Sequence, residues 1–92
     1  MNQQPYSCYV LWSDTGQSFY IGVTDDIPRR LAQHNNSESK WTSRHAGTWQ
    51  IVWSRVFSSL GEARSFENLL KRQKGGAGFF RLTGIPKPSS GS

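Results

Sequence analysis

Residues 6–23 read YSCYVLWSDTGQSFYIGV and contain the clearest structural signal in the chain. Two runs of β-branched and aromatic residues, at 6–12 and 19–23, flank the polar segment 13–17. Apolar runs separated by a segment that contains Asp and Gly are typical of a β-hairpin. The stretch therefore predicts two antiparallel strands joined by a short turn.

A helix is expected directly after the hairpin. Thr24, Asp25 and Asp26 are candidates for its N-cap and place negative charge in its first turn. Pro28 is compatible with a first helical turn, because the N–H that proline lacks has no partner there. These signals predict a helix over about 27–35.

The second half of the domain supplies one more strand and one more helix. After a polar loop, the sequence WQIVWSRVF at 49–57 predicts the third strand. Ser59 and Glu62 form a capping-box pair that opens the second helix. This helix is expected to extend to about Lys74 and to stop at the glycine-rich segment 75–78.

The predicted order of elements is β-β-α-β-α. This order indicates a small α/β (α+β) domain in which a three-stranded antiparallel sheet is flanked by helices. The sequence FFRL at 79–82 is expected to dock as one more short element. We place the domain at 1–83 and expect 84–92 to be a disordered C-terminal tail, since it is rich in Pro, Ser and Gly.

Composition narrows the class of partner. The 92 residues allow one small domain, and 11 Lys and Arg against 6 Asp and Glu give a formal net charge of +5. This balance favours an anionic partner, most often nucleic acid, with acidic lipid or acidic protein as the alternatives. The single cysteine, Cys8, excludes an intramolecular disulfide and a cysteine-rich zinc site, and it fits a reducing cytoplasm. No apolar run approaches the about 18 residues of a membrane span, so we expect no membrane association. We also expect a monomer.

Four polar residues of the first half are candidates for chemistry, although each has an ordinary alternative. Tyr9 and Tyr20 lie on the paired strands, where tyrosine is favoured for packing. Arg30 and His34 share a helix face at i, i+4 spacing, which taken alone is typical of a solvated pair.

Glu67 is the unusual acid of the second half. It lies on or beside the apolar stripe of the second helix, where a carboxylate costs free energy unless it is paired or binds a cation. An ion pair with Arg64, Lys71 or Arg30 is the structural alternative to a cation site.

Taken together and in order, these residues resemble the GIY-YIG nuclease family. The first signature segment is degenerate, as Ser7-Cys8-Tyr9, whereas the second is intact, as Tyr20-Ile21-Gly22. The helix pattern at 24–35 matches, and the stretch Lys40-Trp41-Thr42 is similar to that of the short single-domain bacterial members. The resemblance spans about 6–74.

The resemblance implies the same β-β-α-β-α fold and a metal-dependent phosphodiesterase that cleaves DNA. Glu67 then resembles the ligand of a single divalent cation, Mg²⁺ or Mn²⁺, and Arg30 the arginine that contacts the scissile phosphate. Tyr9 and Tyr20 resemble the tyrosines that orient the attacking water and take part in its deprotonation. A tyrosine with a pKa of about 10 is a poor base at pH 7, so this role requires the metal and Arg30 to lower the pKa. His34 is expected either to relay a proton or to fix the Tyr9 ring by a hydrogen bond.

A DNA-binding surface is expected beside this site, partly on the polar loop at 35–48. The candidate contacts are basic side chains and one tryptophan: Arg29, Lys40, Trp41, Arg44, Lys71 and Lys74. Trp12 and Trp49 are further stacking candidates, with strand packing as the alternative for Trp49. Asp25 and Asp26 would weaken binding if they faced DNA, although a capping role is the simpler interpretation.

The first hypothesis is a metal-dependent DNA endonuclease that prefers single-stranded, flap or branched DNA over a base sequence. The alternative is a non-catalytic or weakly catalytic nucleic-acid-binding module on the same fold. A basic adaptor that delivers a protein partner to DNA is a third interpretation of the charge.

Overall fold

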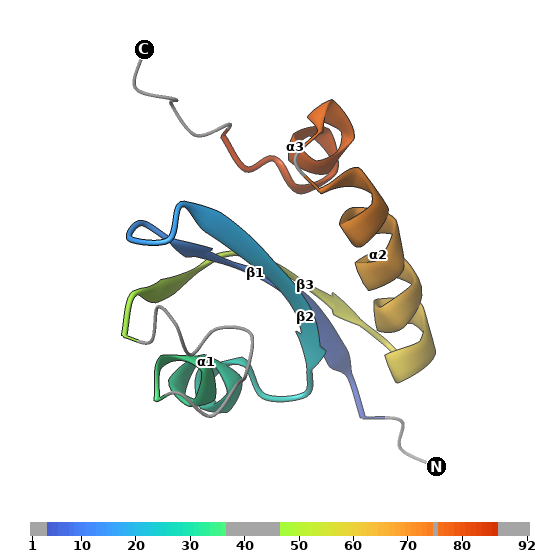
Figure 1. Cartoon of the computed structure of the whole chain (residues 1–92). Helices are drawn as coiled ribbons and strands as arrows, with labels where there is room; N and C mark the ends of the chain where they lie inside the picture. Colours follow the sequence, from blue (N-terminus) through green and yellow to red (C-terminus); the bar gives the residue numbers. More distant parts are fainter. Residues whose placement is uncertain (1–3, 37–46, 75, 87–92) are drawn as a thin grey trace.

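A three-stranded antiparallel sheet in the order β2-β1-β3 lies between helices (Figure 1). The computed structural model describes residues 4–36, 47–74 and 76–86. The elements in chain order are β1 (Tyr6–Ser13), β2 (Ser18–Thr24), α1 (Ile27–Asn35), β3 (Trp49–Phe57), α2 (Leu60–Gln73) and α3 (Ala77–Thr83). Helix α1 covers one face of the sheet, and α2 and α3 lie on the other (Figure 1). The predicted fold is confirmed, with α3 as the additional short element.

The central strand β1 distributes its side chains to two separate cores, because alternate residues of a strand point to opposite faces. Cys8 and Val10 are buried on the α2 face, and Tyr9 and Leu11 are buried on the α1 face. Strand β1 pairs with both neighbours, and a register irregularity against β3 follows Val10. The sheet is therefore covered on both sides around β1, while β2 and β3 form its edges.

The core on the α2 face is aromatic and aliphatic. Its buried members are Cys8, Val10, Ile21, Leu70, Phe79 and Ile85, and Phe19, Val23, Trp53, Phe57, Phe66 and Phe80 pack against them. The α1 face holds the smaller group of Tyr9, Leu11 and Trp49, packed against Tyr20, Ile27 and Leu31. Tyr9, a candidate catalytic residue, and Trp49, a candidate for base stacking, thus lie in the same small core.

Both long helices begin where their caps predict. Asp26 is the N-cap of α1, and its carboxylate accepts a hydrogen bond from the Arg29 backbone N–H at 3.0 Å. Ser59 caps α2 in the same way through the Glu62 N–H, while the Glu62 carboxylate accepts a hydrogen bond from Ser58.

Among the helices described, none is long and apolar enough to cross a lipid bilayer.

The C-terminal boundary differs from the prediction. The sequence placed a disordered tail from residue 84, but Ile85 is buried, with 8% of its surface exposed, and belongs to the core on the α2 face. Gly84 adopts a left-handed φ of 73°, which ends α3 and turns the chain back toward the sheet. The folded part therefore extends to Ile85, and residues 87–92 lie outside the described residues.

Candidate active site

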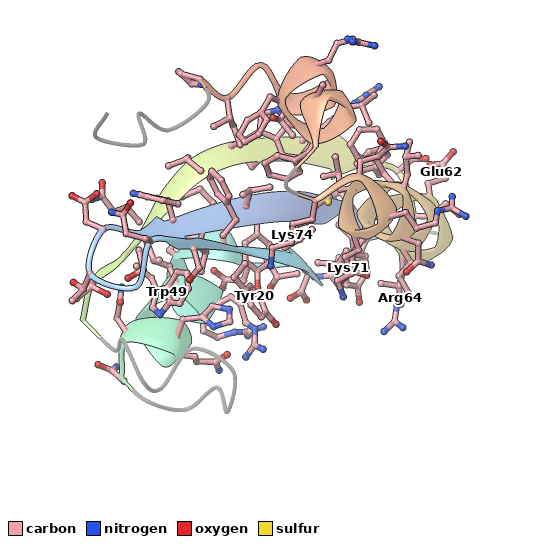
Figure 2. All side chains as sticks on the ribbon, turned by 45° about the horizontal axis from the view of Figure 1, so that its top comes forward. Tyr20, Trp49, Glu62, Arg64, Lys71 and Lys74 are labelled. Atoms are coloured by element: carbon pink, nitrogen blue, oxygen red, sulfur yellow. The ribbon has the colours of Figure 1, made fainter. Side chains whose placement is uncertain are left out.

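Four of the five predicted catalytic residues line a single pocket of about 510 Å³. These four are Tyr9, Tyr20, Arg30 and Glu67, and they come from β1, β2, α1 and α2 in turn. Tyr20 packs with the core on the α1 face, whereas Val23, which also lines the pocket, packs with the core on the α2 face. A pocket that both faces line must lie at the β2 edge of the sheet. In Figure 2, Tyr20 from β2 and Lys71 and Arg64 from α2 point to the same side of the molecule.

Tyr9 is the buried floor of this pocket. Its side chain is only 2% exposed, and its hydroxyl is hydrogen-bonded to His34 Nε2 at 2.9 Å. Gly22 is its antiparallel partner on β2, and a Cβ built on Gly22 would lie 2.6 Å from the Tyr9 hydroxyl oxygen. The absence of a side chain at residue 22 therefore allows the Tyr9 ring to lie against β2 and reach the pocket. This packing supplies the physical reason for a glycine in the intact Tyr20-Ile21-Gly22 segment.

His34 lies behind Tyr9 and is not among the residues that line the pocket. It is fully buried, and its ring centroid lies 4.6 Å from that of Tyr20. Burial, with the positive charge of Arg30 as a second cause, lowers the pKa of His34 to about 4. A neutral imidazole at pH 7 is thus in hydrogen-bond contact with the Tyr9 hydroxyl. His34 was expected either to relay a proton or to fix the Tyr9 ring by a hydrogen bond, and this geometry matches the second role.

Arg30 does not overcome the effect of burial on Tyr9. Burial and the neighbouring Tyr20 raise the pKa of Tyr9 well above its ordinary value, and the Arg30 guanidinium only partly opposes this shift. Burial also lowers the pKa of Arg30, but the hydroxyls of Tyr9 and Tyr20 raise it by more. Within the protein alone, Tyr9 is therefore a protonated phenol at pH 7 and Arg30 is a permanent cation. Arg30 thus acts in the expected direction on the pKa of Tyr9, but in the protein alone its effect is smaller than that of burial.

Glu67 faces the pocket and is paired. Its side chain is 16% exposed, and Oε2 lies 3.1 Å from Lys71 Nζ. Among the three partners considered from the sequence, Lys71 is the one that the structure places on this carboxylate. Within residues 4–36, 47–74 and 76–86, no group of three or more His, Cys, Asp or Glu side chains is arranged to hold a metal ion.

These residues fit a hard cation held by one carboxylate. Mg²⁺ keeps several waters and commonly binds through one or two carboxylates together with substrate phosphates. Glu67 supplies one carboxylate in a pocket that also contains the amide side chain of Asn68 and has room for water. A site that requires several protein ligands would not fit this part of the chain.

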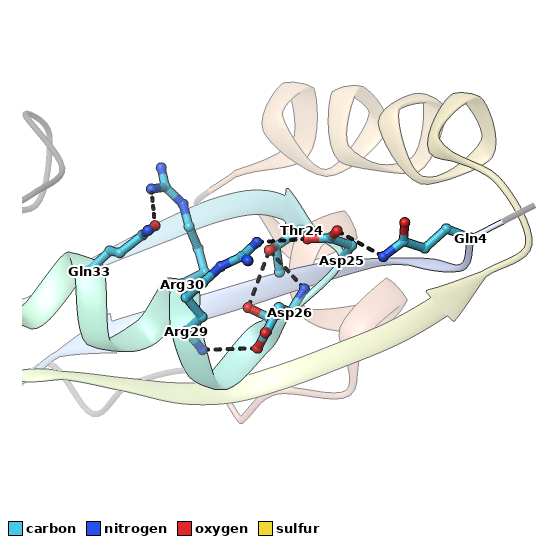
Figure 3. Close-up of polar contacts among 7 residues, drawn as sticks. All are labelled: Gln4, Thr24, Asp25, Asp26, Arg29, Arg30 and Gln33. Atoms are coloured by element: carbon cyan, nitrogen blue, oxygen red, sulfur yellow. Dashed lines mark hydrogen bonds and ion pairs between the residues drawn. The ribbon is translucent and has the colours of Figure 1, made fainter.

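Arg29 and the two aspartates beside it form a local network outside the pocket. Arg29 pairs with Asp25 at 3.0 Å, Asp25 also accepts a hydrogen bond from Gln4, and Asp26 caps α1 (Figure 3). Arg30 turns away from this network and donates to Gln33 at 2.9 Å (Figure 3). The capping interpretation of Asp26 is therefore confirmed, and Arg29 does not line the pocket with Arg30.

The other predicted DNA contacts divide into three groups. Lys71 lines the pocket, and Lys74 lines a second pocket of about 370 Å³ together with Tyr20, Ile21 and Lys71. Lys40, Trp41 and Arg44 lie outside the described residues. Trp49, considered for base stacking, is instead buried in the core beside Tyr9 and Leu11.

Sequence reasoning did not assign Tyr6, Arg64 or Asn68 to the site, although all three line the pocket. For Arg64 the signal was available, because residues three or four apart share a helix face and Arg64 lies three residues before Glu67. Tyr6 has no such signal, since only the pairing of β1 with β2 and the packing of α2 bring it to this edge.

Comparisons with known proteins agree with this geometry. Residues 5–78 match the family model described as the GIY-YIG catalytic domain. A UPF0213 protein of Streptococcus pneumoniae is 42% identical over 66 residues, which are 72% of this chain and 66% of that protein. A UPF0213 protein of Photorhabdus laumondii is 31% identical over 72 residues, covering 78% of this chain and 68% of that one.

A longer relative has a name that states an activity. The structure-specific endonuclease subunit SLX1 of Meyerozyma guilliermondii is 36% identical over 75 residues, which are 75% of this chain and 25% of that subunit. The chain thus spans a little less than two thirds of the pneumococcal relative and one quarter of the fungal one. With the family model matching from the start of β1 to the start of α3, the chain belongs to the GIY-YIG catalytic-domain family.

Proposed function

We propose that this chain is an endonuclease that hydrolyses phosphodiester bonds of DNA with the help of one divalent cation, Mg²⁺ or Mn²⁺, at Glu67. One observation carries the proposal: Tyr9, Tyr20, Arg30 and Glu67, which are far apart in the sequence, line one pocket. Membership of the GIY-YIG family and the similarity to proteins named structure-specific endonuclease subunits support the same activity.

Arg30 has the charge and the position to bind the scissile phosphate. Its guanidinium stays positive at every working pH, and its contact with Gln33 holds it from the α1 side. A fixed cation that faces developing negative charge stabilises a transition state more than a ground state. The planar donor fork also matches two phosphate oxygens at once, which a lysine does not.

Tyr9 is suited to orient the attacking water rather than to deprotonate it unaided. When the Tyr9 hydroxyl donates to neutral His34, its oxygen lone pairs are left to accept a hydrogen bond from a water in the pocket. The raised pKa of Tyr9 keeps its phenol protonated at pH 7, so it cannot take up a proton from water, and the lowered pKa of His34 makes that imidazole a weak base. Tyr20 lines the same pocket beside Tyr9, with ring centroids 6.3 Å apart, and has room for a second contact to water or phosphate.

A cation bound at Glu67 would neutralise phosphate charge and lower the pKa of a bound water. Glu67 is the residue that would hold it, and Asn68 is the neutral oxygen donor beside it in the pocket. Lys71 would compete with the cation for this carboxylate, because its ammonium pairs with Oε2 of Glu67 in the protein alone.

The substrate class that we propose is branched, flap or single-stranded DNA. Its support is the word structure-specific in the names of the SLX1 relatives, together with the net charge of +5. A nicking assay on labelled single-stranded, duplex, flap and four-way substrates, run in Mg²⁺, Mn²⁺ and EDTA, tests the activity and the preference together.

Glu67→Gln is the decisive variant, and Glu62→Gln is its matched control. Glu62 is a carboxylate on the same helix, but it is exposed and does not line the pocket. We expect Glu67→Gln to abolish nicking and Glu62→Gln to retain it. Cleavage by Glu67→Gln at the parent rate would overturn the proposal. DNA binding by the parent protein without cleavage in either metal would instead favour the alternative of a nucleic-acid-binding module.

A further inference from the structure

We propose that Lys71 and Lys74 form a second anion site that binds the DNA backbone phosphate adjacent to the scissile one. This inference rests on the proposed function for the identity of the scissile phosphate. It adds a binding subsite, a direction for the strand across the protein, and a role for a lysine outside the pocket that contains Glu67.

The two pockets are neighbours because they share residues. Tyr20 and Lys71 line both the pocket of about 510 Å³ that contains Glu67 and the pocket of about 370 Å³ that contains Lys74. Figure 2 shows Tyr20, Lys71 and Lys74 along the β2 edge of the sheet, where α2 runs beside it. A nucleic-acid strand whose scissile phosphate lies near Glu67 and Arg30 therefore meets the lysine pair next if it follows α2 toward Gln73, the last residue of that helix.

The second pocket has the chemistry of a phosphate site. The described residues that line it are Tyr20, Ile21, Lys71 and Lys74; among them are two lysines and one tyrosine but no Asp or Glu. Phosphate oxygens accept hydrogen bonds from all three polar groups. Within the described part of the chain, Lys74 makes no ion pair, whereas Lys71 is paired with Glu67.

The lysine pair carries electrostatic repulsion that an anion would relieve. Burial and the nearby charge of Lys71 both lower the pKa of Lys74. Like charges held close together destabilise one another, and a phosphate between them replaces this repulsion with two attractions. Lys71 lies between the two pockets, so it has a carboxylate on one side and room for a phosphate on the other.

A double-mutant cycle between the protein and the DNA backbone tests the site directly. The probe is a fluorescent flap oligonucleotide in which single phosphates are replaced, one at a time, by neutral methylphosphonates. Its affinity for the full chain and for Lys74→Gln is measured by anisotropy in EDTA, so that no cleavage occurs. The cut position is mapped separately with the unmodified flap in Mn²⁺.

In the parent protein, we expect the methylphosphonate next to the cut to weaken binding by up to about fivefold, the upper end of the range for an exposed ion pair. In Lys74→Gln the same replacement is expected to have a clearly smaller effect, because one of the two ammonium partners of that phosphate is gone. Arg72→Gln is the matched control, since Arg72 is an exposed cation two residues earlier on α2 that lines neither pocket. It is expected to keep the full methylphosphonate effect.

Each outcome is decisive. A methylphosphonate profile that is identical in the parent and in Lys74→Gln, or a coupled phosphate several nucleotides from the cut, overturns the inference even if cleavage is robust. Coupling at one phosphate in a protein that cuts none of the substrates supports the anion site and overturns the proposed endonuclease. Thermal unfolding of both variants establishes that the comparison is made between folded proteins.

Discussion

The Tyr9 hydroxyl lies so close to Gly22 that a Cβ on residue 22 would be 2.6 Å from its oxygen. The two residues are partners across β1 and β2, and the glycine leaves the space that the phenol occupies between the strand and His34. The geometry of the proposed water-binding group thus depends on a missing side chain on the neighbouring strand.

Gly22→Ala is expected to displace the Tyr9 ring and to break its hydrogen bond to His34. Overpacking of a buried site typically costs about 1–3 kcal/mol, so we expect a loss of stability in this range and a fall in nicking rate. Denaturant unfolding and the nicking assay measure the two effects. Gly61→Ala is the control, because a Cβ there would make only an ordinary contact, 4.0 Å from the Ser59 hydroxyl, and alanine is favoured over glycine in a helix by about 1 kcal/mol. Equal behaviour of the two variants would contradict the packing account.

His34 is expected to make folding stability depend on pH in a defined window. Its pKa is lowered from 6.5 to about 4, so the unfolded chain binds more protons than the folded one between these values. Stability from this group is therefore fully present above about pH 6.5 and is lost as the pH falls toward 4, by about 3 kcal/mol at most. The measurement is urea unfolding of the parent and of His34→Gln from pH 7 to pH 4. The difference between their stabilities should narrow as the pH falls, and a constant difference would show that His34 is not buried in its neutral form.

Arg30→Lys is expected to reduce the catalytic rate strongly although it keeps the charge. Loss of a donor aimed at transition-state charge typically costs about 100- to 1,000-fold in rate, and an ammonium does not reproduce the bidentate fork. Single-turnover cleavage with saturating protein gives the rate of the chemical step. Arg29→Lys serves as the neighbour control, since Arg29 pairs with Asp25 outside the pocket and should be nearly silent. Similar losses for both arginines would argue for a general effect of charge on DNA binding.

Lys71→Gln is expected to tighten binding of a divalent cation at Glu67 while weakening DNA binding. The Lys71 ammonium is 53% exposed and competes for the carboxylate, and an exposed ion pair is worth about 0.2–1 kcal/mol. Removal of this competitor should improve Mn²⁺ affinity by at most about fivefold, as measured by calorimetry without DNA. Arg72→Gln removes the same charge from α2 without touching Glu67 and should leave Mn²⁺ affinity close to that of the parent. Weaker Mn²⁺ binding by Lys71→Gln would mean that Lys71 does not compete for Glu67.

The elements of the fold follow from signals that neighbouring residues carry. The β-branched and aromatic runs and the turn chemistry of 6–23 place the hairpin, and the carboxylate of Asp26 and the hydroxyl of Ser59 place the starts of α1 and α2. These interactions span only a few residues, so they can be predicted from the sequence. The pattern of the signature residues likewise pointed to Tyr9, Tyr20, Arg30 and Glu67, which the pocket brings together.

The environment of those residues depends on contacts that join distant parts of the chain. Packing between separate elements is required for three of the burials described above: that of His34 behind Tyr9, that of Ile85 in the core on the α2 face, and that of Trp49 in the core on the α1 face. The pairing of Glu67 with Lys71 is different, since its i, i+4 spacing allowed it, but the spacing alone did not exclude Arg64 or Arg30. The amino-acid order thus specified which groups are available for phosphodiester chemistry. Their protonation states, their partners and the shared edge of the two pockets came from desolvation and proximity, which exist only once the sheet and helices have packed.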